Sequence, residues 1–149
     1  MQISIETNAP VKSSAEIIVE APVVAVWRVL TEIDKWPDWQ ESVTSALLKG
    51  PLVPGTRFDW KSGGLKFISH IHTCEPHMEF GWTGKTFGAR AIHNWTFTEQ
   101  GNQTRVAVEE SLNGIFPRLF RKGFQKTLET GMSKSLEELR RAVENIVAQ

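Results

Sequence analysis

A β-hairpin signal between residues 91 and 112 constrains the fold of this chain more than any other feature. Apolar residues occupy alternate positions of residues 91–97 and again of residues 106–112, with Gly101-Asn102 between the two runs. A period of two is typical of a half-buried strand, and a glycine-containing pair is typical of a tight turn. A two-residue turn there places His93 opposite Glu110, on the same face as the large apolar side chains.

Turn residues divide the region before this hairpin into further short strands. With a strand at 14–20, the pattern predicts seven strands, joined mostly by short turns into a strongly curved antiparallel sheet. The six strands expected after the first are 43–49, 56–62, 65–74, 77–83, 87–98 and 103–112.

Helical signals flank these strands. Pro22 and the apolar spacing that follows it predict a short helix ending near residue 33, and Pro37 predicts a second one within residues 35–41, so that the two form a V. Residues 116–147 are expected to be helical, but their apolar face changes direction near two glycines, Gly123 and Gly131.

Two interpretations of this last region stay open. Either the helix bends at Gly123, or its first turns form a separate segment. The missing bulk at Gly123, Thr127 and Gly131 predicts space between helix and sheet, of the kind a ligand cavity needs, while close packing of helix on sheet is the alternative.

Composition excludes several classes of protein. The 149 residues include 17 Lys and Arg and 17 Asp and Glu, so no overall basic field exists to attract nucleic acid. No apolar run approaches the ~20 residues of a membrane span, and residues 1–10 lack the features of a signal peptide. Cys74 is the only cysteine, which excludes an internal disulfide. We therefore expect a soluble, cytoplasmic protein without membrane insertion.

The order and spacing of short motifs resemble the START-like (SRPBCC) superfamily, in its polyketide cyclase/dehydrase and lipid-transport grouping. The residues that carry this resemblance are Ala21-Pro22, Val26-Trp27, Leu30-Thr31, Trp36-Pro37-x-Trp39, Pro54-Gly55-Thr56, Glu75-Pro76, Phe80-Gly81-Trp82, His93-x-Trp95-x-Phe97, Thr104-Arg105-Val106, Glu110 and Gly114. The resemblance covers about residues 14–144. It implies an α+β helix-grip fold: a curved seven-stranded sheet around a long C-terminal helix, with two short helices after the first strand. We expect a loose lead-in at 1–13 and one domain at 14–149.

The resemblance also implies an apolar cavity between the concave sheet and the last helix. The residues that match the usual lining are Phe58, Trp60, Phe67, Phe80, Trp82, Trp95, Val108, Phe120 and Phe124, together with His93 and Glu110. Fold alone does not fix activity, so function has to be argued from this site.

His93 and Glu110 are the candidate catalytic pair. A carboxylate beside an imidazole can exchange protons near neutral pH, and such a pair could enolise, cyclise or dehydrate a polyketide-like substrate. The alternative is an ion pair that only orders the cavity rim, because buried polar groups generally need partners.

Two histidines on one strand, His70 and His72, have a spacing that some metal sites use. Their face of the strand is the less apolar one, so we expect both side chains to point outward. A metal site needs three or four converging ligands, and the sequence supplies no further ones. No metal and no cofactor are expected.

Two other groups of residues carry alternative interpretations. Trp36 and Trp39 either gate a cavity mouth or plug the end of the sheet. Arg118, Arg121 and Lys122, near the start of the last helix, either meet an anionic head group at the entrance or form a solvated charged face.

Three functions remain as hypotheses. The first is binding of a small hydrophobic ligand that is aromatic, polyketide-like or lipid-like. The second is a cofactor-free cyclase/dehydrase that uses His93 and Glu110 as acid and base. The third is an interaction domain of the Hsp90-activator type, with an exposed apolar patch in place of a cavity. A homodimer is compatible with each.

Overall fold

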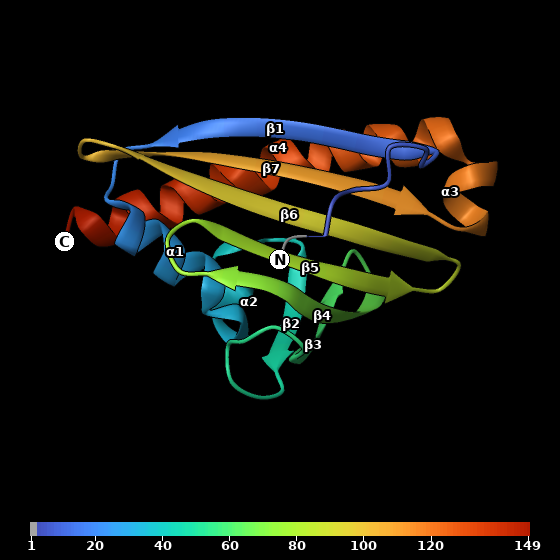
Figure 1. Cartoon of the computed structure of the whole chain (residues 1–149), viewed down its shortest axis with the longest axis horizontal. Coiled ribbons are helices and arrows are strands. Elements are labelled where there is room, and N and C mark those ends of the chain that lie inside the picture. Colours follow the sequence, from blue (N-terminus) through green and yellow to red (C-terminus); the bar gives the residue numbers. More distant parts are fainter. Residues whose placement is uncertain (1–2) are drawn as a thin grey trace.

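Seven strands form one antiparallel sheet in the computed structural model, which describes residues 3–149. Each strand from β2 to β6 pairs with the next along the chain, and β1 joins the sheet beside β7 (Figure 1). The predicted seven-stranded antiparallel sheet is thus confirmed. The strands are β1 (Val11–Val19), β2 (Val43–Leu48), β3 (Arg57–Ser62), β4 (Leu65–Glu75), β5 (Glu79–Thr86), β6 (Ala89–Gln100) and β7 (Gln103–Asn113).

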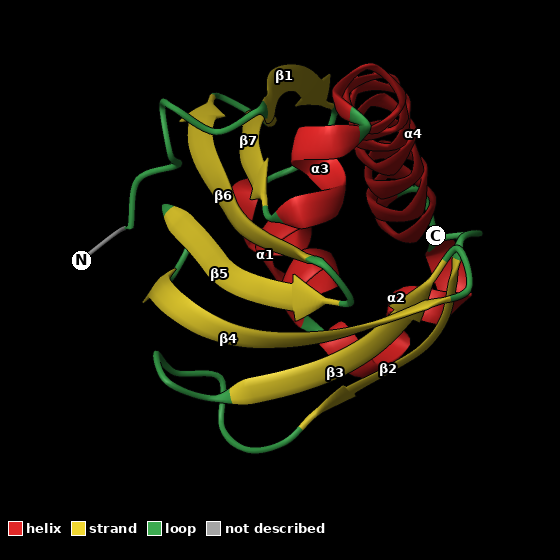
Figure 2. Cartoon of the chain, turned by 90° about the vertical axis from the view of Figure 1, so that its right-hand side faces the viewer, coloured by secondary structure: helices red, strands yellow, loops and turns green. Residues whose placement is uncertain are grey.

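The sheet is strongly curved, and its concave face is turned toward the C-terminal helices (Figure 2). The pairing register shifts within β2, between Val43 and Ser45, and within β4, between Ile71 and Thr73. Such irregularities bend a strand and increase its local twist. They therefore favour the curvature by which both edges of the sheet bend toward the C-terminal helices.

The β6–β7 hairpin has the predicted register. Gly101 adopts a φ of 65°, which an L-residue with a side chain rarely takes, and the chain reverses there. His93 pairs with Glu110 and Trp95 with Val108, so one face of the hairpin carries both the titratable pair and the aromatic side chains.

Two short helices follow β1, as predicted. α1 (Val23–Thr31) begins directly after Pro22, and its apolar residues other than the exposed Val24 pack against the core. A 3₁₀ turn, η1 (Ile33–Lys35), leads into α2 (Trp36–Trp39), where the chain changes direction.

The C-terminal region is two helices. α3 (Ile115–Leu119) and α4 (Arg121–Val147) are separated at Phe120, whose φ of −118° and ψ of 44° are not helical. The alternative with a separate first segment is therefore the correct one, although the break lies at Phe120, before Gly123. α4 packs along β1 and α1 and buries Met132, Leu136, Leu139 and Val143. Among residues 3–149, no helix combines the length and apolar character that a membrane crossing requires.

The segment before β1 lies on the outer, convex face of the sheet. The backbone carbonyl of Ile3 accepts a hydrogen bond of 2.7 Å from the Asn94 amide, and the Glu6 backbone N–H donates to Ser111 Oγ at 3.1 Å. β1 begins at Val11, three residues before the expected position, because pairing with β7 extends as far as Leu112. Residues 1 and 2 of the expected lead-in lie outside the described residues.

Candidate functional site

The candidate site is built around His93 and Glu110, which are direct cross-strand neighbours on the concave face. His93 Nδ1 contacts Glu110 Oε1, and the two side chains are 18% and 14% exposed. Both residues come from the long β6–β7 hairpin, whose backbone pairing on either side fixes their separation. The imidazole is thus held by its carboxylate partner in one orientation.

Aromatic stacking fixes the plane of the same imidazole. The ring centroids of His93 and Trp82 are 4.4 Å apart, and their planes differ by 10°. The Trp95 ring lies 5.4 Å from the imidazole, with an angle of 23° between the planes. Together with the Glu110 contact, these two rings leave the imidazole little freedom to rotate.

Two nitrogens of this cluster have no protein partner. His93 Nε2 and Trp95 Nε1 are both buried and form no hydrogen bond within the described residues. A buried polar group without a partner costs roughly 1–3 kcal/mol. Because Nδ1 faces the carboxylate, the neutral ring carries its proton on Nδ1 and presents an acceptor lone pair at Nε2. The polar groups that the site leaves for a bound molecule are therefore the imidazole Nε2 and the indole N–H of Trp95.

Strands β3 and β4 supply a second aromatic wall. Trp60 and Phe67 are half-buried and stack at 4.7 Å, with an angle of 22° between their planes. Trp60 Nε1 donates a hydrogen bond of 3.0 Å to the buried Ser69 Oγ. A Cβ on Gly84 would lie 2.9 Å from that same oxygen, so the glycine makes room for the hydroxyl that positions the indole.

Phe58 and Phe80 are placed deeper than the rest of the expected lining. Both are 0% exposed, because the helices send Trp27 and Trp36 against them. Trp82, Trp95 and Val108 keep 3–4% of their surface accessible. Phe58 and Phe80 therefore belong to the core, where they pack against Trp82, and do not line an accessible surface.

The two lining residues expected on the C-terminal helices differ in exposure. Phe124 is half-buried on α4, whereas Phe120 is 59% exposed at the break between α3 and α4. Gly123, Thr127 and Gly131 are all exposed, and a Cβ on Gly131 would meet no atom within 4 Å, so space between helix and sheet at these positions stays a prediction. Sequence reasoning missed Leu128, one turn after Phe124 and also half-buried, although its helical spacing was the available signal.

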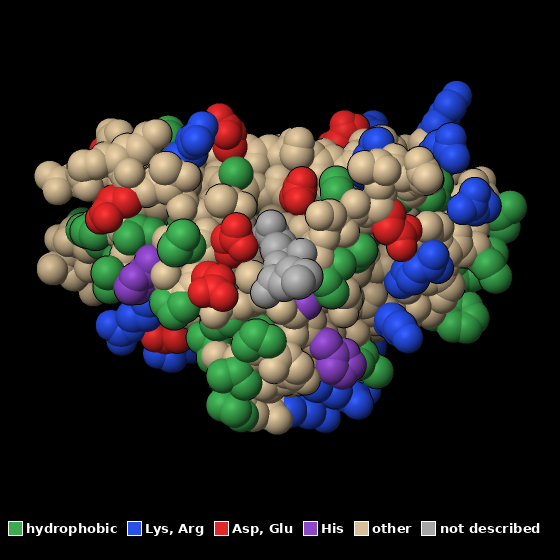
Figure 3. Space-filling model, viewed as in Figure 1, with side chains coloured by type: hydrophobic (Ala, Val, Ile, Leu, Met, Phe, Trp, Pro, Cys, Tyr) green, Lys and Arg blue, Asp and Glu red, His purple; other side chains and the backbone are tan. Residues whose placement is uncertain are grey.

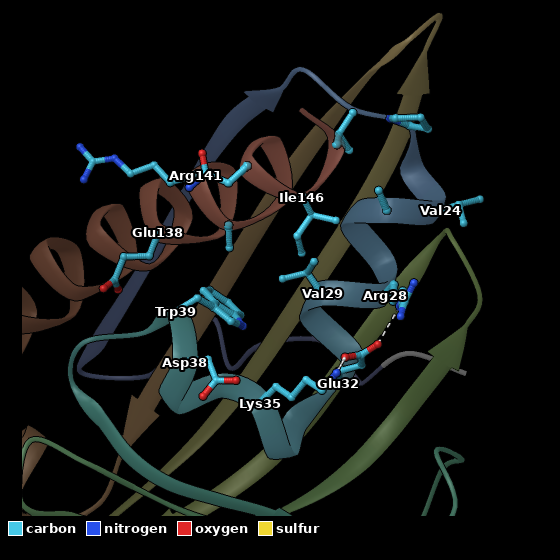
Figure 4. Close-up of a pocket in the computed structure, with 15 residues that line it drawn as sticks. Val24, Arg28, Val29, Glu32, Lys35, Asp38, Trp39, Glu138, Arg141 and Ile146 are labelled. Carbon is cyan, nitrogen blue, oxygen red and sulfur yellow. Dashed lines mark hydrogen bonds and ion pairs between the residues drawn. The ribbon is translucent and has the colours of Figure 1, made fainter. Parts of the chain in front are cut away.

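A groove of about 820 Å³ lies elsewhere, between α1, α2 and the end of α4 (Figure 4). Val29, Trp39 and Ile146 contribute its apolar part. Glu32 pairs with Arg28 at 2.8 Å and with Lys35 at 3.0 Å. Two of the cations that line the groove are therefore already neutralised by a carboxylate of the protein. Hydrogen bonds from these two cations lower the pKa of Glu32 below its usual range.

The two tryptophans expected near a cavity mouth have different environments. Trp36 is 2% exposed, and its indole N–H donates to the Leu30 carbonyl at 2.9 Å, which makes it part of the core. Trp39 is half-buried and borders the groove of Figure 4.

The remaining candidates lie away from the concave face. His70 is exposed, and His72 lies beside Gly81 and Asn94, which places it under the N-terminal segment; burial lowers its pKa below the ordinary value. Burial likewise raises the pKa of the Cys74 thiol. Across residues 3–149, no three His, Cys, Asp or Glu side chains converge as metal ligands.

Comparison with solved structures shows the same fold in several bacterial proteins. A START superfamily protein from Mycobacterium smegmatis matches with a TM-score of 0.78 and 11% identity, covering 91% of this chain and 98% of that one. The Zhui aromatase/cyclase from Streptomyces sp. R1128 matches with a TM-score of 0.78 and 14% identity, covering 91% and 94%. A hypothetical protein from Helicobacter pylori has a TM-score of 0.81 and 16% identity, covering 96% and 98%.

Sequence comparison gives a family. A search of curated proteins finds no match. The family model described as polyketide cyclase / dehydrase and lipid transport matches residues 10–144, nearly the whole chain. With its START-like helix-grip fold, the chain belongs to the polyketide cyclase/dehydrase and lipid-transport family.

Proposed function

We propose that this protein binds a small hydrophobic ligand, ring-containing or lipid-like, between the concave face of the sheet and α4. The observation that carries the proposal is the buried His93 Nε2, which lacks a protein partner while Nδ1 is held by Glu110. Buried polar groups in native proteins are nearly always paired, so a lone acceptor among aromatic rings suits a ligand hydroxyl or amide N–H.

The surrounding rings set the class of ligand. Trp60 and Phe67 are half-buried and offer apolar ring surface to an aromatic or polyene ligand, while Trp82 and Trp95, 4% and 3% exposed, hold the imidazole in place. Stacking and burial supply the affinity, and the two nitrogens fix the orientation. No charged group other than the His93–Glu110 pair is part of this wall, which favours an uncharged ligand.

A second candidate is catalysis of the cyclase/dehydrase kind. The observation that favours it is the same Glu110–His93 contact, because a carboxylate at Nδ1 orients the imidazole as a general base at Nε2. The base would take a proton from a carbon beside a carbonyl and return it to a hydroxyl that leaves as water. The Zhui aromatase/cyclase shares the fold of this chain and, at 14% identity, supports the fold alone.

One variant separates the two candidates. The probes are 1,8-dihydroxyanthraquinone and its parent anthraquinone, whose binding is followed by quenching of tryptophan fluorescence. We expect His93→Gln to weaken the dihydroxy probe by up to about tenfold, because one hydrogen bond is worth ~0.5–1.5 kcal/mol, and to leave the parent compound unchanged. His70→Gln, on the exposed outer face, is the matched control.

Two results would contradict ligand binding at this site. One is equal quenching by both probes that survives Phe124→Ala and His93→Gln, and the other is no quenching at all. For the enzyme hypothesis, a polyketide-like 1,3-diketone is incubated with the wild type and with His93→Gln. A fall in turnover of ~10²-fold with binding kept supports catalysis.

A further inference from the structure

One end of the molecule carries exposed apolar side chains that the concave site does not use. Phe87, in the β5–β6 turn, is 84% exposed, and Ile115, Leu119 and Phe120, in and after α3, are 67%, 68% and 59% exposed. We call these four residues the α3 patch. An apolar side chain left in water forgoes roughly 1.5–3 kcal/mol of burial, so four of them in one place indicate an interaction surface.

The α3 patch is a built surface, held in place by packing beneath it. The ring of the half-buried Phe116 lies 5.6 Å from Phe87 and 6.5 Å from Phe120, and so connects the turn with the end of α3. Gly88 allows this contact, because a Cβ there would lie 2.3 Å from the Phe116 ring. The Phe116 backbone N–H also donates to the Gly88 carbonyl at 3.2 Å.

Positive charge surrounds the patch. Residues 111–128 contain Arg118, Arg121, Lys122 and Lys126 and no carboxylate, although the whole chain has a formal net charge of zero. All four are exposed, and within residues 3–149 none of them forms an ion pair. Lys85 and Arg90 flank Phe87; Arg90 pairs with Glu6 at 3.9 Å, and Lys85 has no acidic partner in the described part of the chain.

The space-filling view shows the same gathering of positive charge. At the end of the molecule where α3 lies in Figure 1, Lys and Arg side chains gather beside hydrophobic ones (Figure 3). The local charge therefore departs from the neutral average of the chain.

We propose that the α3 patch is a peripheral docking site for an anionic lipid bilayer. Membrane-surface binding sites combine apolar side chains such as phenylalanine and leucine with lysine and arginine. The apolar side chains enter the boundary between headgroups and acyl chains, and the cations contact anionic lipids. The patch is formed by a tight turn and a short helix at one end of the molecule, which suits a broad planar surface. No helix spans the bilayer in this arrangement, and the docking does not depend on a ligand in the concave site.

The test is co-sedimentation of the full chain with vesicles of phosphatidylcholine, with or without phosphatidylglycerol. We expect binding to the anionic vesicles and its loss in ~1 M NaCl, where the Debye length falls to ~3 Å. Phe87→Ser/Leu119→Ser and Arg121→Gln/Lys122→Gln should each lower the partition coefficient by about tenfold. All four side chains are exposed, so folding, checked by circular dichroism, should be unchanged.

Matched controls come from the opposite end of the molecule. Val24→Ser/Met78→Ser removes two side chains that are 58% and 64% exposed, and Arg28→Gln/Arg141→Gln removes two cations that are 74% and 71% exposed. Both should leave the partition coefficient within about twofold of the wild type, because only side chains near the bilayer surface contribute to binding.

Three results would overturn the proposal. These are no binding to anionic vesicles, equal binding to neutral ones, or equal losses in the control variants. Light scattering without vesicles tests a protein occupant: a dimer that Phe87→Ser/Leu119→Ser dissociates would identify a second copy of the chain as the partner and would also overturn it.

Discussion

At the scale of single residues, the two faces of the sheet treat their histidines in different ways. His93 on the concave face is fixed by a carboxylate and two aromatic rings, and one of its nitrogens stays without a protein partner. His72 on the convex face accepts a hydrogen bond of 3.4 Å from the Ile3 backbone N–H, so the N-terminal segment covers it. Nε2 of each histidine is buried without a hydrogen-bond partner among the described residues, but only the His93 ring is stacked between two tryptophans on the concave face.

Asp59 on β3 gives a prediction on acid stability. Its carboxylate accepts hydrogen bonds from Arg57 at 2.8 and 3.0 Å and pairs with Lys49 at 3.1 Å. The Arg57 hydrogen bonds are the main cause that lowers the pKa of Asp59 from 3.8 to about 2. A carboxyl group whose pKa is lower in the folded state stabilises the fold above its unfolded pKa, and this stabilisation is lost as pH falls from about 4 to about 2.

Replacement of this carboxyl group should therefore lower the free energy of unfolding only at pH values where the carboxyl group is ionised. We expect Asp59→Asn to lower the free energy of unfolding by up to about 1 kcal/mol at pH 7, and the difference from the wild type to vanish near pH 2. Urea unfolding at a series of pH values measures it. Asp38→Asn, at an exposed position on α2, is the matched control. A difference that stays constant with pH would contradict the assignment.

At the scale of elements, the break between α3 and α4 decides what the C-terminal region can do. α3 turns Phe116 onto Gly88, while α4 starts a new direction that packs Leu128 against the core and buries Leu139 in it. The sequence left a bend and a separate segment as equal alternatives. It could not choose, because the break depends on the contact of Phe116 with the β5–β6 turn, which lies 28 residues earlier in the chain.

The same substitution at two glycines tests this account of the C-terminal elements. Gly114 begins α3 at a φ of 122°, and a Cβ there would lie 2.6 Å from the Gly88 carbonyl oxygen, so Gly114→Ala should cost about 2 kcal/mol or more. Gly131 lies inside α4 with open space beside it, so Gly131→Ala should gain about 0.5–1 kcal/mol. Thermal unfolding measures both; equal signs for the two variants would contradict the account.

At the scale of the whole molecule, local patterns predicted the sheet, while long-range contacts decided which side chains are accessible. The turn at Gly101-Asn102 was enough to set His93 opposite Glu110. The complete burial of Phe58 and Phe80 was not predictable, because Trp36 and Trp27 reach them from helices distant in the chain. The exposure of the α3 patch also escaped prediction, since Phe120 was assigned to the cavity lining by resemblance.

The core joins α4 to the sheet, which predicts that the whole chain unfolds in one step. Leu139 is 0% exposed and belongs to one core cluster that includes Val26 of α1 and Trp82 of β5. Leu139→Ala should therefore destabilise the fold by about 2–5 kcal/mol, whereas Ile146→Ala, 55% exposed on the same helix, should change it by less than about 0.5 kcal/mol. Urea unfolding followed by circular dichroism, to which α4 as the longest helix contributes most, and by tryptophan fluorescence, for the sheet with α1 and α2, should give coincident transitions with an unchanged m value. Separate transitions in Leu139→Ala would mean that α4 and the sheet are independent folding units, and would contradict the prediction.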